Sequence, residues 1–272
     1  MIHSNVLADS VGDVLSDGIS GADGDIIVIN PSRAIISALV DVLDEESRPA
    51  TVRLFAAREP LKYLMDDFLV ASAVADLIES GALAVRTLDA VPNNALVLST
   101  DSVVSLVESD EQVAGLATDD GAFVEETYAH YDERWADAPE FSLRTPPRSR
   151  VMETLEADIG PESAADFEAM LDSLETARGD GEGLDEVTVS LLVAAKNGEL
   201  LYDISKWGED VGVASKATFS RTKTRLEDNG MLDTEKVPID VGRPRLRLLL
   251  GDQRLADADA DELAAVAQEL LA

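Results

Sequence analysis

The segment between positions 184 and 250 carries the pattern that most constrains the fold. Apolar residues recur at helical spacing in a first helix, which we expect to end near Gly198. Ser205 is suited to cap a short second helix, which ends in a turn at Gly212. Ser215 is suited to cap a third helix, and Asn229-Gly230 to stop it. Three helices in this order, with glycine in the turn, predict a helix-turn-helix.

The third helix has two chemically different faces. Ala217, Phe219 and Leu226 are the apolar positions expected to hold it against the other two helices. The remaining face is basic and hydroxylic, with Arg221 near its middle. In a helix-turn-helix the amino-terminal part of this helix enters the major groove, where arginine pairs with guanine. The exposed face is therefore the surface predicted to contact the bases of DNA.

Two strand-like runs follow directly. Met231 to Val237 and Pro244 to Leu250 are separated by a turn, and leucine alternates with arginine in the second run. This period of two is typical of a half-exposed strand. The runs predict a β-hairpin wing with Arg243 at its tip.

The charge changes sign in this region. The chain has a formal net charge of -32, yet positions 215 to 250 hold eight basic and five acidic residues. A local excess of cations in so acidic a chain indicates that phosphates lie here. The residues predicted to contact DNA are Ser215, Lys216, Thr218, Ser220, Arg221, Lys223, Thr224, Arg225, Arg243 and Arg245.

The acidic residues elsewhere are dispersed along the whole length. Fifty-four Asp and Glu oppose 22 Lys and Arg among 272 residues, and aromatic residues make up 4%. This pattern favours a halophilic source, because at 1 M salt the Debye length shrinks to about 3 Å and self-repulsion is screened. An ordinary acidic cytosolic protein remains the alternative. No apolar run approaches ~18 residues, so we expect no membrane segment and a cytoplasmic location.

The first half of the chain alternates between strand-like and helical patterns. The run from Asp25 to Asn30 is nearly all β-branched, and further strand-like runs follow up to about position 118. We predict an α/β domain over residues 1–140, with a mixed sheet and flanking helices, acting as a sensor or interaction domain. A short amphipathic helix containing Leu7, Val11, Val14 and Leu15 should precede it.

Three further segments complete the predicted organisation. Residues 141–183 form a linker and connecting helices, with a helix break at Gly160-Pro161. Arg144, Arg148 and Arg150 in the linker fit either a solvated connector or a phosphate-touching arm. Residues 184–251 form the winged helix-turn-helix, and residues 252–272 form a C-terminal amphipathic helix. Apolar faces on the connecting and terminal helices need partners, within the chain or in a second copy, and a homodimer is expected.

The first domain offers few candidate site residues. Asn30, Ser32 and Arg33 follow the first strand at a helix amino terminus, where they would either bind an anionic effector or simply cap the helix. The chain has no cysteine, two histidines and no Walker A motif, so we expect no enzyme, cofactor or metal site.

The motifs GVASKATFSRTKTRLEDNGML and GRPRLRL resemble the winged-helix units of MarR- and TrmB-type regulators. The chain as a whole resembles the haloarchaeal TbsP-like transcriptional regulators. The resemblance implies a cytoplasmic transcription factor with Lys216, Thr218, Ser220, Arg221 and Arg243 at DNA-contact positions. Thr222 departs from the pattern by standing at an often apolar position, and the reading domain comes late in the chain. An adaptor whose winged helix binds protein remains the alternative.

Overall fold

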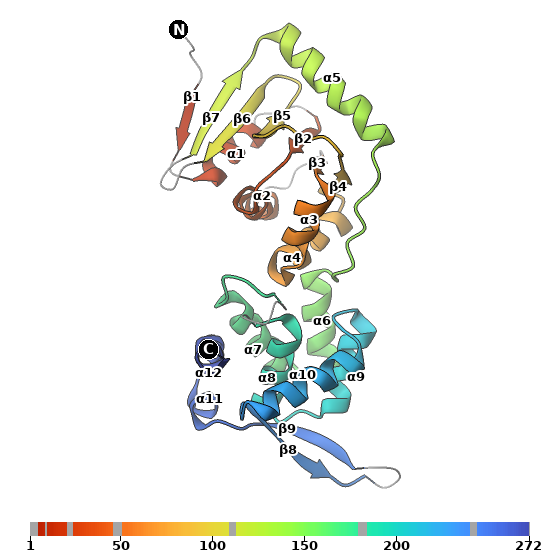
Figure 1. Ribbon diagram of the computed structural model, residues 1–272, viewed down its shortest axis with the longest axis vertical. Helices are drawn as coiled ribbons and strands as arrows, with labels where there is room; N and C mark the ends of the chain where they lie inside the picture. Colours follow the sequence, from red (N-terminus) through yellow and green to blue (C-terminus); the bar gives the residue numbers. More distant parts are fainter. Residues whose placement is uncertain are drawn as a thin grey trace. The chain divides into compact units, whose positions relative to one another are not determined.

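The protein divides into two compact units. The computed structural model describes residues 5–8, 10–20, 24–45, 51–108, 113–178, 184–239 and 244–271. Unit 1 comprises residues 1–65 and 73–143, and unit 2 comprises residues 66–72 and 144–272. Each unit, shown as a ribbon in Figure 1, has its own hydrophobic core.

Unit 1 is built on a mixed sheet, which confirms the predicted fold class. Its described strands have the order β1-β7-β6-β5-β2-β3-β4. Strands β2, β3 and β4, at one end of the sheet, run parallel, whereas the other neighbours pair antiparallel. The strands are β1 (Asn5–Ala8), β2 (Ile26–Ile29), β3 (Val52–Ala56), β4 (Leu83–Thr87), β5 (Ala95–Leu98), β6 (Val103–Glu108) and β7 (Val113–Thr118).

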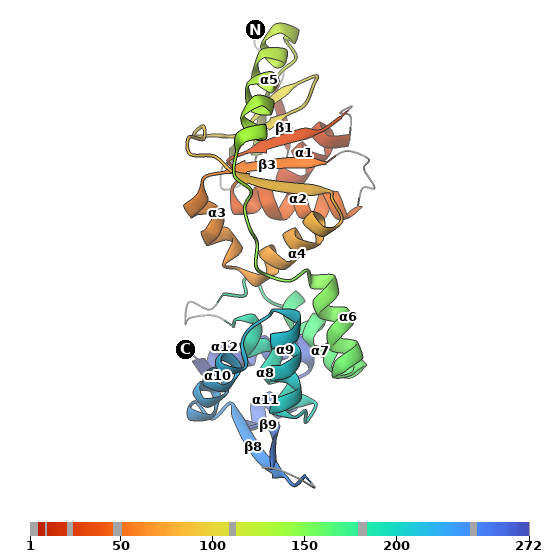
Figure 2. The same cartoon turned by 90° about the vertical axis from the view of Figure 1, so that its right-hand side faces the viewer.

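Helices cover both faces of this sheet. Figures 1 and 2 show α5 along one face and α2 on the other, where α1 packs against α2. The helices are α1 (Val11–Ser20), α2 (Arg33–Glu45), α3 (Arg58–Met65), α4 (Phe68–Glu79, of which residues 73–79 belong to unit 1) and α5 (Gly121–Asp137).

The predicted helix around Asn5 is wrong in its first part. Asn5 to Ala8 form β1, an edge strand that pairs antiparallel with β7, and α1 begins only at Val11. The apolar spacing of Leu7, Val11, Val14 and Leu15 fits a helix, but β7 offers a ladder of unpaired backbone groups. A partner more than 100 positions away therefore overrides the local period.

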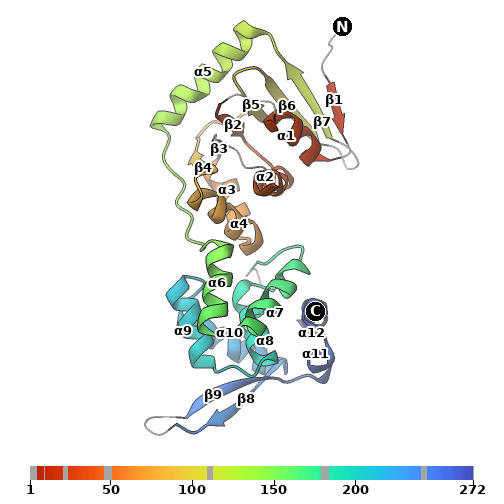
Figure 3. The same ribbon diagram turned by 180° about the vertical axis from the view of Figure 1, so that it is seen from behind.

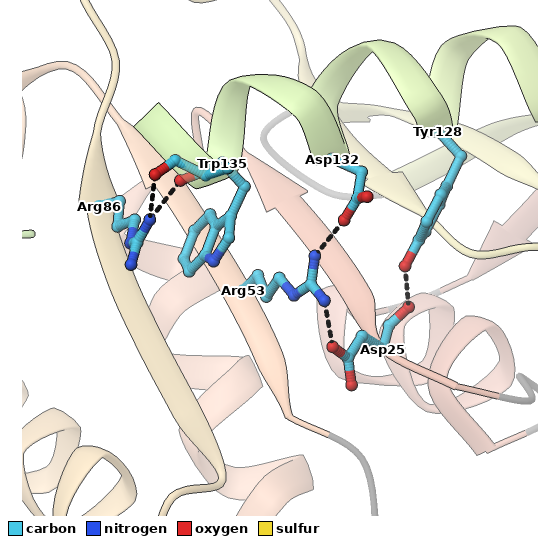
Figure 4. A network of polar contacts seen from close by, with 7 residues as sticks. Asp25, Arg53, Arg86, Tyr128, Asp132 and Trp135 are labelled. Carbon is cyan, nitrogen blue, oxygen red and sulfur yellow. Dashed lines mark hydrogen bonds and ion pairs between the residues drawn. The ribbon is translucent and has the colours of Figure 1, made fainter. Parts of the chain in front are cut away.

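Two arginines on the sheet fix the position of α5. Arg53 on β3 donates to Asp132 on α5 and to Asp25 beside β2, each at 2.5 Å (Figure 4). Arg86 on β4 donates to the carbonyl oxygen of Trp135, and its guanidinium lies 5.0 Å from the centre of the indole ring. These contacts bind the long helix to the parallel part of the sheet.

Unit 2 is a helical domain with a two-stranded hairpin. Its helix α8 is central, because all residues from Val187 to Ala195 are buried. The elements are α6 (Arg148–Asp158), α7 (Pro161–Asp172), α8 (Glu186–Lys196), α9 (Leu201–Val211), α10 (Lys216–Asp228), β8 (Leu232–Val237), β9 (Arg245–Leu250), α11 (Gln253–Asp257) and α12 (Ala260–Leu271).

The connecting and terminal helices are part of the core of unit 2. The break at Gly160-Pro161 is confirmed: Gly160 has φ 149° and Pro161 is the first residue of α7. Arg148 ties α6 to α7 through an ion pair of 2.5 Å with Asp172. On α12, Leu263 is fully buried, and the helix packs against α7 (Figure 3). The apolar faces thus find partners within this chain, which removes them as an argument for a dimer.

Glu186 at the start of α8 should make the stability of unit 2 depend on pH. Burial raises its pKa from 4.5 to about 7, and the charges of Asp185 and Asp67 add to the effect. The unfolded chain therefore gives up this proton at lower pH than the folded one, so stability falls as pH rises from 4.5 to 7. We expect Glu186→Gln to gain about 1–2 kcal/mol over the native chain at pH 8 but not at pH 4.5.

Urea unfolding of both chains at pH 4.5, 6 and 8 measures this difference. The many other carboxylates titrate alike in both proteins and cancel in the comparison. A free-energy difference that stays constant across the three pH values would contradict the prediction.

Candidate nucleic-acid interface

The turn between α9 and α10 has the geometry of a helix-turn-helix. Gly212 ends α9 with φ 94°, a left-handed conformation that favours glycine. The hydroxyl of Ser215 accepts from the amide of Thr218 at 3.2 Å and caps α10. Gly230 takes φ 70° directly after Asn229, the C-cap of α10. These predicted ends of the helices are confirmed.

The predicted start of α9 is wrong. The helix begins at Leu201, so Ser205 lies inside it, buried, and its hydroxyl donates to the carbonyl oxygen of Tyr202 at 3.2 Å. The extra turn places Leu201 against the core of unit 2, alongside the fully buried Ile204. Apolar burial therefore extends α9 beyond the residue best suited to cap it.

The packed face of α10 differs from the prediction at one position. Phe219 and Leu226 are fully buried, as expected, but Ala217 is exposed. Thr222 takes its place and is 8% exposed. Residues three and four apart share a helix face, so 219, 222 and 226 point inward together while 217 lies to the side. Thr222, which stands where the resembled helices often have an apolar residue, is therefore a polar residue at a core position.

Away from the packed face, α10 presents hydroxyls and two arginines, Arg221 and Arg225, to solvent. Ser220, Arg221 and Thr224 are all exposed. Arg221 donates to the hydroxyl of Thr218 at 3.4 Å, and no ion pair between described residues includes it. Among the described residues, its guanidinium is thus held by a neutral group of its own helix.

Two other cations of α10 engage the protein itself. Lys223 forms an ion pair of 2.6 Å with Glu227, and its side chain is only 13% exposed. Arg225 donates to the hydroxyl of Thr188 on α8 at 3.0 Å. Both side chains thus have partners within unit 2. The Lys223–Glu227 pair has the i,i+4 spacing of a helical ion pair, whereas the contact of Arg225 with α8 depends on tertiary packing.

Two cations close to the start of α10 are paired with carboxylates. Lys216 lies 2.8 Å from Glu209 on α9. Arg245 on β9 lies 3.1 Å from Asp203 on α9. All four side chains are between 37% and 44% exposed. Sequence reasoning missed Glu209 and Asp203, because acidic residues are too abundant in this chain to single any out.

The hairpin after α10 is the predicted wing. β8 pairs antiparallel with β9, from Leu232 opposite Leu250 to Val237 opposite Arg245. A bridge from Leu200 to Arg247 and the buried Leu248 attach the hairpin to the helices. Arg243, predicted at the tip, lies outside the described residues.

The candidate ligand residues of unit 1 have structural partners. Asn30 has φ 51°, and its side-chain amide donates to the carbonyl oxygen of Pro92 at 2.9 Å. Ser32 accepts from the amide of Ile35 at 3.2 Å, so it caps α2, which begins at Arg33. The predicted capping role of Asn30 is therefore wrong, since Ser32 performs it.

A hollow of about 580 Å³ in unit 1 lies elsewhere, between α1 and α2. Ser10, Asp13, Ser37 and Asp41 are among its lining residues, none of which the sequence had indicated. The described residues contain no cluster of His, Cys, Asp and Glu that could hold a metal ion. They also contain no helix of the length and apolar character that crossing a bilayer requires.

Family models match nearly the whole chain. The model of the TbsP-like transcriptional regulator N-terminal domain matches residues 3–146, and that of the TbsP-like C-terminal HTH domain matches residues 147–268. The chain belongs to the TbsP-like transcriptional regulator family. The matched helix-turn-helix region, residues 147–268, lies within unit 2 and includes α10.

Similarity to solved structures is weak and partial. TrmBL2, described as an archaeal chromatin protein with a novel mode of DNA binding, is 14% identical with a TM-score of 0.36, and the match covers 52% of this TbsP-like chain. That match spans only 55% of the TrmBL2 chain.

Two further solved structures show similar values. Nuc from Salmonella typhimurium, a phospholipase D family member, has 13% identity, a TM-score of 0.38 and coverage of 51% of this chain and 97% of its own. NucT from Helicobacter pylori has 17% identity, a TM-score of 0.38 and coverage of 51% and 99%. No curated protein matches the chain. TM-scores this low support no argument about function.

Proposed function

We propose that this member of the TbsP-like family is a sequence-specific DNA-binding regulator of a halophilic archaeon. The observation that carries the proposal is the exposed face of α10, where Arg221 stands among hydroxyls without an acidic partner among the described residues. In a chain with net charge -32, a cation free of carboxylates at this position fits recognition of a base edge or phosphate. A regulator of chromosomal genes works in the cytoplasm.

The proposed contact residues fall into two groups. Thr218, Ser220, Arg221 and Thr224 lie on or beside the exposed face of α10 and would face bases and the nearest phosphates. The other proposed residues would contact the DNA backbone, and the paired ones must first leave their protein partners. This second group consists of Ser215, Lys216, Lys223, Arg225, Arg245 and, outside the described residues, Arg243.

Genome-wide mapping of bound DNA, followed by a gel shift on the enriched sites, tests the proposal. We expect a common sequence motif among the sites and retention of labelled duplex by the purified protein. A protein that shows no enrichment and no retention, yet pulls down a defined protein partner, would favour the adaptor function instead.

Salt should affect this DNA binding in an unusual way. Most DNA-binding proteins lose affinity steeply as salt rises, because phosphates release counterions when cations neutralise them. Here the long-range repulsion between an acidic chain and DNA extends to about 30 Å at 0.01 M salt and is screened at higher concentrations. We therefore expect operator affinity to stay flat or rise as KCl increases from dilute buffer toward molar levels.

Fluorescence anisotropy titrations across that range measure the effect, and circular dichroism confirms that the fold is intact at each concentration. A monotonic loss of several decades in affinity would contradict this expectation. It would mean that phosphate attraction dominates over the repulsion.

We further propose that the protein acts as a homodimer and that unit 1 responds to a small molecule or partner. Support for the dimer is that one winged helix contributes few base contacts, so two copies on a two-fold site would add specificity. Support for the effector is the hollow between α1 and α2. Light scattering of the DNA complex should report twice the chain mass of 29.0 kDa in addition to the mass of the duplex. A value of one chain per DNA at all concentrations would exclude the dimer.

A further inference from the structure

A hollow of about 490 Å³ lies on unit 2 where α9, α10 and β9 meet. Its lining includes the side chains of Tyr202, Ser205, Lys216, Ser220 and Arg245. Lys216 and Arg245 are cations and Ser220 carries an exposed hydroxyl, and these groups match the oxygens of a phosphate. The remaining lining residues are apolar and are Leu201, Ile239, Pro244 and Leu246. The two cations come from different elements, because Lys216 opens α10 and Arg245 opens β9.

Both cations of this hollow are neutralised by carboxylates of α9. Glu209 accepts from the ammonium of Lys216 at 2.8 Å and also from its backbone amide at 3.3 Å. This contact lowers the pKa of Glu209 and raises that of Lys216. Asp203 holds Arg245 at 3.1 Å and 3.5 Å through its two carboxylate oxygens. The four formal charges at the hollow sum to zero.

A ligand that binds the two cations more strongly can displace the carboxylates of Glu209 and Asp203 at a small cost in free energy. Each of the four side chains is more than one-third exposed, and ion pairs in such positions contribute little to stability because solvent screens them. The guanidinium of Arg245 lies 4.4 Å from the centre of the Tyr202 ring, so it keeps its place over the ring when Asp203 is displaced. A phosphate oxygen would find both cations already in position.

We infer that this hollow seats one phosphate of the DNA backbone, and that Glu209 and Asp203 occupy its two cations in the free protein. Binding then exchanges a carboxylate of the protein for a phosphate of the DNA. This inference rests on the proposed DNA-binding function. It deepens that function by naming a seat for the backbone and two acidic residues that set the affinity and its dependence on salt.

The exchange has a measurable consequence. A cation that is free in the unbound protein steepens the fall of log K with log[salt] by about 0.9 when it binds a phosphate. Lys216 and Arg245 add little to that slope, because a carboxylate of the protein already neutralises each of them. Removing both carboxylates should therefore steepen the slope by about 1–2 and raise the affinity at 0.1 M KCl by roughly tenfold or more.

The experiment compares the native chain with Glu209→Gln/Asp203→Asn on two duplexes. One is an operator identified by genome-wide mapping, and the other is a duplex of the same length and arbitrary sequence, since a backbone contact does not depend on sequence. Titrations by fluorescence anisotropy at 0.05, 0.1, 0.2 and 0.4 M KCl give affinity and slope for each. We expect both quantities to increase for the variant on both duplexes.

A matched control separates the local exchange from the change in net charge. Glu156→Gln on α6 with Glu168→Gln on α7 removes the same two charges from exposed positions of unit 2 that do not line the hollow. We expect less than a twofold change in affinity for this control. Equal gains for the two double variants would overturn the inference in favour of a general charge effect.

The remaining outcomes separate a failure of the phosphate-binding inference from a failure of the proposed DNA-binding function. If the native chain binds the operator and Glu209→Gln/Asp203→Asn has the same affinity and slope, the phosphate seat is wrong while the regulator function holds. If the native chain binds neither duplex, the proposed function itself fails. Glu209→Gln alone, which keeps an oxygen to accept from the amide of Lys216, repeats the test should the double variant fold poorly.

Discussion

Replacing Gly208 by alanine is expected to destabilise unit 2 by about 3 kcal/mol and to abolish DNA binding at physiological temperature. A Cβ at this position of α9 would lie 2.4 Å from two ring carbons of Phe219 on α10. The ring is fully buried, so it has no free space to enter. The two helices of the helix-turn-helix can approach as they do only because position 208 carries no side chain.

Thermal and urea unfolding of Gly208→Ala measure this loss, with two companion variants. Gly121→Ala is the matched control, because a Cβ at that helical position meets no heavy atom of the described residues within 4 Å. We expect Gly121→Ala to be neutral or slightly stabilising. Phe219→Leu removes the ring atoms at the clash, so Gly208→Ala should cost much less in that background. Additive costs in the double variant would contradict the steric explanation.

Arg221→Ala is expected to weaken operator binding by about 1–3 kcal/mol, which corresponds to roughly 5- to 150-fold. The side chain is exposed on α10, and within the described part of the chain it is held by the hydroxyl of Thr218 alone. It therefore gives up little when it pairs with guanine, in contrast to Lys223, which must leave Glu227. A gel-shift titration against the mapped operator measures the change, and urea unfolding should show no loss of stability.

The control is the conservative variant Arg221→Lys. A lysine keeps the charge but cannot form the planar pair of hydrogen bonds that guanine O6 and N7 accept. If Arg221 reads a base, Arg221→Lys should lose most of the specificity and relax the preference at one base pair. If it contacts only a phosphate, Arg221→Lys should retain the affinity. An unchanged affinity in Arg221→Ala would remove the residue from the contact set.

Much of the fold followed from local patterns. The alternating runs predicted the mixed sheet of unit 1, because a β-branched strand and an amphipathic helix have different periods wherever they occur. The end of α9 at Gly212 and the start of α10 at Ser215 were predictable for a similar reason. A left-handed turn and a side-chain cap each depend on a few adjacent residues.

The errors arose where a distant partner competes with a local preference. Asn5 to Ala8 form a strand because β7 offers an open edge, which no window around Asn5 contains. Ser205 has the chemistry of a cap, yet the core of unit 2 extends α9 past it to Leu201. Thr222, not Ala217, faces inward because the direction of α10 is set by where Phe219 and Leu226 meet the other helices.

For the candidate site, the sequence showed where cations are in excess, and the tertiary structure decided which of these cations already have acidic partners. The excess of cations between positions 215 and 250 was visible in the amino-acid order alone, since charge is a property of composition. Which of those cations are occupied depends on distances between elements: Glu209 reaches Lys216 and Asp203 reaches Arg245 only after α9 has packed against α10 and β9. Coulomb attraction depends on separation in space, which residue spacing along the chain does not define. Packing therefore decided that Lys216 and Arg245 are paired with carboxylates of α9, whereas Arg221 faces solvent with no carboxylate partner among the described residues.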